Sequence, residues 1–149
     1  MAQHTLAQRM EHVIRTYIQA CNDADAIAIA ARLCPEAVHY FPSGDPRRTK
    51  WLGAAAIGVN FAKIVQEQGV CWTVDQLLTD ADRRASTLEW TRFNRQRDRI
   101  VRGVDWFVFE PQTICIQEIR PYTAAPINSD MMRQELADFD YARRGYPTT

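Results

Sequence analysis

An aspartate lies in one of the most apolar stretches of the chain, and its chemistry there could be that of an acid or a base. Residues 103–110 read GVDWFVFE, in which six of the eight residues are apolar or glycine, and Asp105 stands between Val104 and Trp106. Burial of an unpaired carboxylate is costly, so a carboxylate in such a strand either faces water or has a function. Asp105 is therefore the first candidate for a functional residue.

Metal chemistry, by contrast, is not expected from this sequence. The four cysteines stand far apart, no C-x-x-C pair occurs, and the histidines do not cluster near them, so zinc spacing is absent. We therefore expect no metal, no cofactor and no disulfide. The four residues expected to be free, mostly buried thiols, as in a cytoplasmic protein, are Cys21, Cys34, Cys71 and Cys115.

The composition is that of one ordinary globular domain. The chain has 149 residues, 46% of them hydrophobic and 24% charged, which is enough to build a proper core. Its 18 basic and 18 acidic residues give no net charge, so we expect neither a nucleic-acid partner nor attraction to a membrane surface. The N-terminal residues lack the apolar region of a signal peptide, and no later apolar run could span a bilayer, which predicts a cytoplasmic protein.

Three helices are expected in the first half of the chain. Thr5 and Gln8 have the spacing of a capping box, and apolar residues then recur with helical period as far as Cys21. Pro35 ends a second, short helix, and Gly69 ends a third. The expected helices cover residues 6–21, 26–33 and 51–69.

The second half of the chain has the pattern of strands joined by tight polar turns, which predicts an antiparallel meander. A single domain over residues 1–149 is expected, with a linker, a short helix and a tail over residues 123–149. Helices followed by a curved antiparallel sheet make an α+β domain, and a sheet wrapped around the first helix leaves a cone-shaped pocket. The expected strands cover residues 37–41, 71–78, 85–94, 99–110 and 113–122.

Four stretches in this order resemble the nuclear-transport-factor-2-like (NTF2-like) superfamily, and within it the SnoaL-like polyketide cyclases and ketosteroid isomerases. They are RTYIQACNDAD, PEAVHYFPSG, WLGAAAI and VDWFVFE…IQEIRPY, and the similarity covers about residues 6–122. The resemblance implies a cone-shaped α+β barrel, N-terminal helices wrapped by a curved antiparallel sheet, and a homodimer formed through the outer face of the sheet. It does not choose a reaction, because this fold hosts isomerases, cyclases, dehydratases, hydrolases and plain binding proteins.

The resemblance to ketosteroid isomerases also implies roles for individual residues. Their oxyanion-binding tyrosine corresponds to Tyr17, and their oxyanion-binding aspartic acid, which stays protonated, corresponds to Asp105 in VDWFVF. Their catalytic base corresponds to Phe41, so isomerisation of the ketosteroid type is not expected here.

Strand alternation completes the candidate pocket, because every second side chain of a strand points to the same face. If Asp105 points inward, its own strand and its neighbours contribute an aromatic lining with a few polar groups, as a small-molecule site needs. The residues expected to share that inner face are Phe107, Leu88, Trp90, Arg92, His39 and Phe41.

Arg92 decides the expected protonation state of Asp105. An arginine close to a carboxyl group lowers its pKa, so Asp105 is expected to be an ionised base or a group that positions water. This is similar to the limonene epoxide hydrolases, which use a buried Asp–Arg–Asp set, although their second aspartate corresponds to Pro121 here.

The sequence thus predicts a cofactor-independent acid–base enzyme that acts on a small, hydrophobic, oxygenated molecule. Asp105, Arg92, Tyr17 and His39 would be its catalytic groups, with Phe41, Leu88, Trp90 and Phe107 as substrate-binding walls. Proton transfer, ring closure, dehydration and water addition all stay open. The alternative is a non-catalytic binding or scaffolding protein of the same fold, in which Asp105 and Arg92 form only a structural ion pair.

Overall fold

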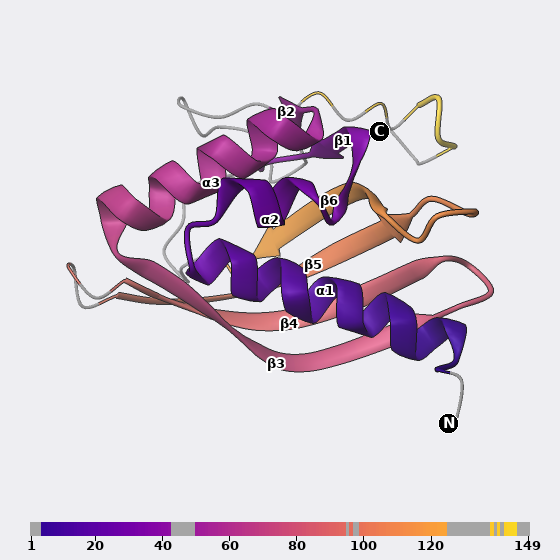
Figure 1. Cartoon of the computed structure of the whole chain (residues 1–149), viewed down its shortest axis with the longest axis horizontal. Helices are drawn as coiled ribbons and strands as arrows, with labels where there is room; N and C mark the ends of the chain where they lie inside the picture. Colours follow the sequence, from indigo (N-terminus) through magenta and orange to yellow (C-terminus); the bar gives the residue numbers. More distant parts are fainter. Residues whose placement is uncertain are drawn as a thin grey trace.

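A computed structural model describes residues 4–42, 50–94, 96, 99–124, 138, 140 and 142–145. Within these residues, three helices lie on one side of a curved six-stranded sheet, and the predicted α+β class with N-terminal helices packed against a curved sheet is confirmed (Figure 1). Of residues 130–139, where the short helix after the linker is predicted, only residue 138 is described, so this prediction lies outside the described residues.

The first helix, α1 (Leu6–Asn22), forms as predicted. Its capping box is complete, because Gln8 N donates to Thr5 Oγ1 over 3.2 Å and Thr5 N donates to Gln8 Oε1 over 2.8 Å. The apolar stripe becomes the buried face of the helix, with Met10, Ile14 and Tyr17 at most 2% exposed. This face packs into the concave side of the sheet.

The second helix is shorter than predicted, and the strand after it begins earlier. Helix α2 (Ala26–Ala30) is capped by the Asp25 side chain, and β1 (Leu33–His39) already starts at Leu33, which pairs with Ile116. Pro35 lies inside β1, where the register with its neighbour shifts between Leu33 and Val38. A proline donates no backbone hydrogen bond, so it is tolerated where the ladder is interrupted.

The third helix is preceded by a short strand that sequence analysis assigned to the helix itself. Strand β2 (Trp51–Leu52) pairs with the end of β1, and α3 (Ala54–Gln68) follows. Helix α3 ends as predicted at Gly69, whose φ of 60° lies in the left-handed region that favours glycine.

The predicted meander is confirmed. It consists of β3 (Val70–Asp80), β4 (Ala85–Asn94), β5 (Arg99–Phe109) and β6 (Ile116–Thr123), each antiparallel to the next. The sheet order is β2-β1-β6-β5-β4-β3, so β1 adds to the meander beside β6, to which it runs parallel. This parallel pair brings the first and last strands together.

A side chain joins the end of α1 to the sheet. The Asn22 amide donates to the carbonyl oxygen of Trp72 over 2.8 Å and accepts from the Trp72 amide over 2.8 Å, which satisfies both backbone groups on β3. The helix therefore keeps a defined position over the concave face.

A disulfide corrects the expectation of four free thiols. Cys34 of β1 and Cys115, just before β6, are bonded, with their Cα atoms 5.3 Å apart, while Cys21 and Cys71 are free. The two residues are 81 positions apart, and only the parallel pairing of β1 with β6 brings them together. Spacing along the chain carries no sign of such a contact.

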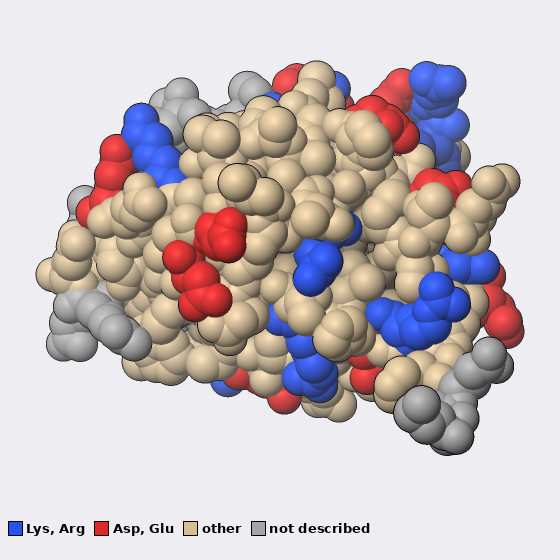
Figure 2. Space-filling model, viewed as in Figure 1, with Lys and Arg blue, Asp and Glu red and all other residues tan. Residues whose placement is uncertain are grey.

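The surface of the described residues shows mixed charge and no membrane-crossing element. On the helical side of the molecule, Lys and Arg side chains are scattered among Asp and Glu and separated by broad uncharged areas (Figure 2). None of the described helices is both long and apolar enough to cross a membrane.

Candidate functional site

Asp105 lies on the concave face of the sheet, as the alternation in VDWFVF predicts. It is paired with Leu88 of β4 on one side and with Pro121 of β6 on the other. Phe107, two residues along the same strand, is fully buried, whereas Trp106 on the opposite face is 40% exposed. Only 9% of the surface of Asp105 is exposed, so the residue lies in the interior.

Trp90 of β4 provides the hydrogen bond that Asp105 needs. Its indole Nε1 donates to Asp105 Oδ1 over 2.8 Å, and the ring is itself buried. Trp90 was expected only as an apolar wall. Its polar edge makes it the direct partner of the carboxyl group.

The protonation state of Asp105 differs from the prediction. Burial raises the pKa of Asp105 to about 7, and the Trp90 hydrogen bond partly opposes that rise. Both protonation states are therefore populated near neutral pH. The expectation of a lowered pKa and a firmly ionised carboxylate is wrong.

The reason is the position of Arg92 along its strand. Arg92 is paired with Val101, whereas Leu88 is the residue opposite Asp105, so the two side chains start from positions about 13 Å apart along the strand. No ion pair joins them within the described part of the chain. Alternation predicts the face of a strand on which a residue lies, but the place along the strand also decides which residues meet.

Tyr17 of α1 approaches the same region from the helix. Its ring meets Phe107 edge-on, with ring centres 6.1 Å apart, and only 2% of the residue is exposed. Its hydroxyl group is buried and has no hydrogen-bond partner of normal geometry among the described residues. A ligand oxygen is the kind of group that would complete it.

The environment keeps the Tyr17 hydroxyl protonated. Burial raises the pKa of Tyr17 well above its usual value, and the neighbouring Cys21 thiol and the Asp105 carboxyl raise it further. Burial also raises the pKa of Cys21, so the thiol is protonated as well. Tyr17 is therefore a neutral donor at physiological pH, and Cys21 is no nucleophile.

His39 of β1 lies in a box of aromatic rings next to this cluster. The imidazole centre is 4.5 Å from the Phe41 ring, 5.0 Å from Phe61 and 5.8 Å from Trp51, and His39 is 3% exposed. Phe61 of α3 also contacts Tyr17, with ring centres 6.2 Å apart. A continuous line of rings thus runs from His39 through Phe61 and Tyr17 to Phe107.

The structure therefore sorts the predicted residues into two neighbouring groups. Tyr17, Trp90, Asp105 and Phe107 share the interior beside Leu88, and His39 and Phe41 form the aromatic box. Phe61 and Cys21 also contribute to this region, although the sequence did not single them out as site residues. Their signal was their helical spacing, since Cys21 is one turn beyond Tyr17 and Phe61 follows Ile57 by one turn.

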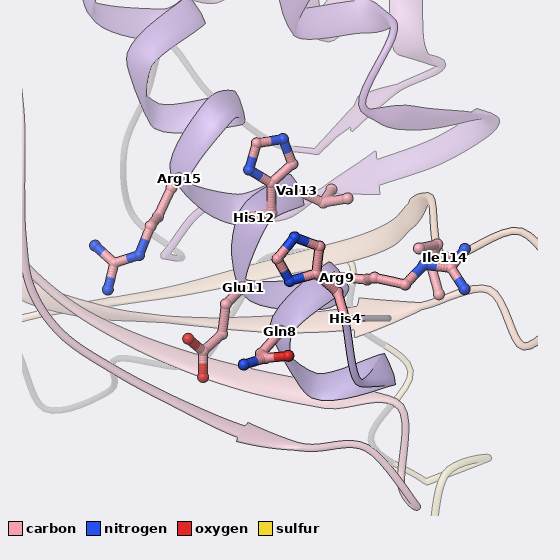
Figure 3. Close-up of a pocket in the computed structure, with 8 residues that line it drawn as sticks. All are labelled: His4, Gln8, Arg9, Glu11, His12, Val13, Arg15 and Ile114. Carbon is pink, nitrogen blue, oxygen red and sulfur yellow. The ribbon is translucent and has the colours of Figure 1, made fainter. Parts of the chain in front are cut away.

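No group of three or more potential metal ligands occurs among the described residues. A surface hollow of about 490 Å³ follows the N-terminal half of α1, and Figure 3 shows most of its side chains spread along the helix, with Ile114 contributed by the segment before β6. None of the predicted site residues belongs to its lining, which is His4, Gln8, Arg9, Glu11, His12, Val13, Arg15 and Ile114.

No protein-family model matches the sequence. No curated protein matches it either.

Solved structures are informative. A crystal structure of a protein of unknown function with a cystatin-like fold, from Methylobium petroleophilum PM1, is 41% identical and has a TM-score of 0.90, with 96% of this chain and 93% of that chain covered. An NTF2-like protein of unknown function from Cytophaga hutchinsonii ATCC 33406 is 14% identical, with a TM-score of 0.62 over 83% of this chain and 93% of that chain. The chain thus belongs to one family with the Methylobium protein, and it has the NTF2-like fold that the sequence predicted.

Enzymes also occur among the structural neighbours. SalBIII, an epoxide hydrolase/cyclase-like enzyme with a role in pyran ring formation in the polyether salinomycin, is 18% identical, with a TM-score of 0.64 over 78% of this chain and 92% of that chain. Other neighbours are ketosteroid-isomerase-like and polyketide-cyclase-like. At these identities the likeness is one of fold.

Proposed function

We propose that this protein is a cofactor-independent acid–base enzyme whose substrate is a small, hydrophobic, oxygenated molecule bound between α1 and the concave face of the sheet. The observation that supports it is Asp105, whose carboxyl group is buried, held by an indole N–H and brought to a pKa of about 7. A general acid or base works best when its pKa is close to the working pH.

Asp105 and Tyr17 take complementary roles in this proposal. Asp105 exchanges a proton with the substrate. Tyr17 stays protonated and donates its hydroxyl hydrogen to a substrate oxygen on which negative charge develops. The apolar walls, Leu88 and Phe107, exclude water and strengthen both interactions.

Reactions that need one proton-transferring carboxyl group fit this arrangement best. Phe41 stands where the ketosteroid isomerases have their base, and its ring packs against Trp51 and His39. Ring closure, dehydration or addition of water to a strained oxygen ring remain, with His39 as the second acid or base. The fold shared with a hydrolase/cyclase-like enzyme supports this group of reactions. Arg92 stays a predicted contributor on the same face.

A non-catalytic binding protein is the second candidate. The line of rings from His39 to Phe107 favours it, because aromatic walls bind apolar ligands without any chemistry. Such a protein would need Tyr17 only as a donor to its ligand and would have no use for the pKa of Asp105.

Assembly and location complete the proposal. A homodimer through the convex face is supported by the apolar side chains exposed there, Ile100 (67%), Trp106 (40%) and Tyr122 (52%).

A cytoplasmic location is harder to reconcile with the Cys34–Cys115 disulfide, since the cytoplasm keeps thiols reduced. Alkylation of cells at lysis, followed by mass spectrometry of the two cysteines, tests it.

The experiment that tests the function compares turnover and binding in matched variants. A panel of apolar epoxides, hydroxyketones and enones is screened for turnover, and binding is followed by ligand-observed NMR. Asp105→Asn is expected to abolish turnover and to keep binding, whereas Asp82→Asn, an exposed control, keeps both. Ligands that bind to wild type but are never converted, with the same affinity in Asp105→Asn, would favour the binding protein instead.

A further inference from the structure

We propose that Trp90 is the positioning residue of Asp105, and that Gly103 is required because the Trp90 ring occupies the place of its side chain. This inference rests on the proposed function only where it gives Asp105 a role in catalysis. The contacts themselves belong to the protein without a substrate.

Trp90 and Gly103 are in close contact. The two residues are direct cross-strand partners on β4 and β5. A Cβ atom on residue 103 would lie 2.4 Å from Cζ2 and 2.6 Å from Cη2 of the indole, and 2.8 Å from the carbonyl oxygen of Tyr122. These distances are far below van der Waals contact, so only glycine leaves room for the ring.

The Trp90 ring extends along β5 from Gly103 to Asp105. Gly103 and Asp105 are two residues apart, so the place of the missing side chain and the Asp105 carboxyl group lie next to each other on one face. The indole crosses Gly103, and its Nε1 arrives 2.8 Å from Asp105 Oδ1. A side chain at position 103 would interrupt this path.

The hydrogen bond from Trp90 distinguishes the two carboxyl oxygens of Asp105. An indole N–H can donate but cannot accept, so Oδ1 is the acceptor whether Asp105 is protonated or ionised. Oδ2 is then the oxygen that exchanges a proton with a ligand. Trp90 thereby fixes both the orientation of the carboxyl group and the identity of its reactive oxygen.

No charged group among the described residues competes with the indole for this control. From α1, Tyr17 and Cys21 interact with Asp105, and both are neutral because burial raises the pKa of each. The neighbouring strands present Leu88 and Pro121 opposite Asp105. Burial and the Trp90 hydrogen bond are thus the two opposing influences on the Asp105 carboxyl group.

The decisive experiment titrates Asp105 directly. Carboxyl ¹³C NMR of protein with labelled aspartate gives the midpoint for each residue, and the signal missing from Asp105→Asn assigns Asp105. Trp90→Phe keeps an aromatic ring and removes the donor, and the midpoint of Asp105 is expected to rise by about one pH unit. Trp106→Phe, on the opposite face, is the matched control and is expected to leave it unchanged.

Gly103→Ala tests whether the Trp90 ring needs the space that a side chain at position 103 would fill. The added methyl group displaces the indole, so the Asp105 midpoint is expected to rise as in Trp90→Phe. In the double variant, Gly103→Ala is expected to add nothing to the effect of Trp90→Phe, because both act through the same bond. If Gly103→Ala does not fold, Trp90→Phe decides alone.

The outcomes separate this inference from the proposed function. An Asp105 midpoint that is unchanged in Trp90→Phe overturns the positioning role, even if Asp105→Asn is inactive. A raised midpoint supports it, even if no turnover is ever found. If turnover is found, the pH profile of kcat/KM in Trp90→Phe should move by the same amount and in the same direction as the titration.

Discussion

Two carboxyl groups on the opposite faces of one sheet show how strongly the local environment decides their chemistry. On the concave face, burial raises the pKa of Asp105 to about 7, with one indole N–H opposing that rise. On the opposite face, Asp75 accepts hydrogen bonds from Thr73 over 2.6 Å and from Thr91 over 2.5 Å, and these bonds lower its pKa. Arg102, 3.6 Å away, favours the ionised form further.

The comparison indicates where acid–base chemistry can occur. Asp75 is held ionised by two hydroxyl groups and an arginine, so it has no tendency to take up a proton near neutral pH. Asp105 has one donor and little access to water, so its protonated and ionised forms are close in free energy. The residue type is the same, and only the environment of Asp105 brings the pKa of the carboxyl group close to neutral pH.

The largest expected effect is on turnover. Asp105→Asn removes the exchangeable proton, and turnover is expected to fall by about two to four orders of magnitude, the usual contribution of a general acid or base. Asp75→Asn should leave turnover unchanged. Steady-state kinetics on the two variants measures the contrast, and equal losses in both would show that the two faces do not differ in function.

The disulfide links β1 to the start of β6 within the sheet that carries both carboxyl groups, so its loss should weaken the whole sheet. The Cys34–Cys115 bond closes a loop of 81 positions, and chain entropy predicts a loss of about 4–5 kcal/mol in the free energy of unfolding when it is removed. Urea denaturation of a Cys34→Ala/Cys115→Ala variant measures this loss, with Cys71→Ala as control. An unchanged free energy of unfolding in the double variant, even with an altered titration of one carboxyl group, would contradict this prediction.

The dependence of stability on pH should have opposite signs for the two carboxyl groups. The pKa of Asp105 is raised from 3.8 to about 7 in the folded chain, so its contribution is complete below about pH 4 and is lost as the pH rises to about 7, by about 4 kcal/mol. The pKa of Asp75 is lowered, so its contribution is present above its unfolded pKa and is lost as the pH falls.

Urea denaturation from pH 3 to pH 8 measures both effects. Asp105→Asn should be more stable than wild type at pH 8, and the difference should vanish at low pH. Asp75→Asn should be less stable than wild type at neutral pH, and that difference should shrink in acid. Parallel curves for the two variants would refute the contrast between the faces.

The smallest expected effect concerns two tyrosine hydroxyl groups. Tyr17→Phe removes a buried hydroxyl without a hydrogen-bond partner of normal geometry in the described chain, so stability should stay the same or rise by about 1 kcal/mol. Tyr40→Phe removes a hydroxyl that accepts from Arg144 over 3.2 Å, so stability should fall by about 1 kcal/mol. Thermal unfolding of both variants measures the difference, and a clear loss in Tyr17→Phe would indicate that its hydroxyl already has a partner.

Local patterns in the sequence were sufficient for several features of this protein. The capping box at Thr5 and Gln8, the end of α3 at Gly69 and the bounds of β4 follow from rules that act over a few residues. The inward direction of Asp105 follows from alternation along β5. Each of these depends on neighbours in the chain, which a sequence displays directly.

Only the tertiary structure decided which side chains meet. The hydrogen bond from Trp90 to Asp105, the distance of Arg92 from it and the Cys34–Cys115 disulfide all depend on strand register and on the parallel pairing of β1 with β6. The hydrogen bond joins residues 15 positions apart and the disulfide joins residues 81 positions apart, and both are set by how the whole sheet curves over α1. The pKa of Asp105 follows from them, because burial and a single donor, not the residue type, determine how tightly it holds its proton.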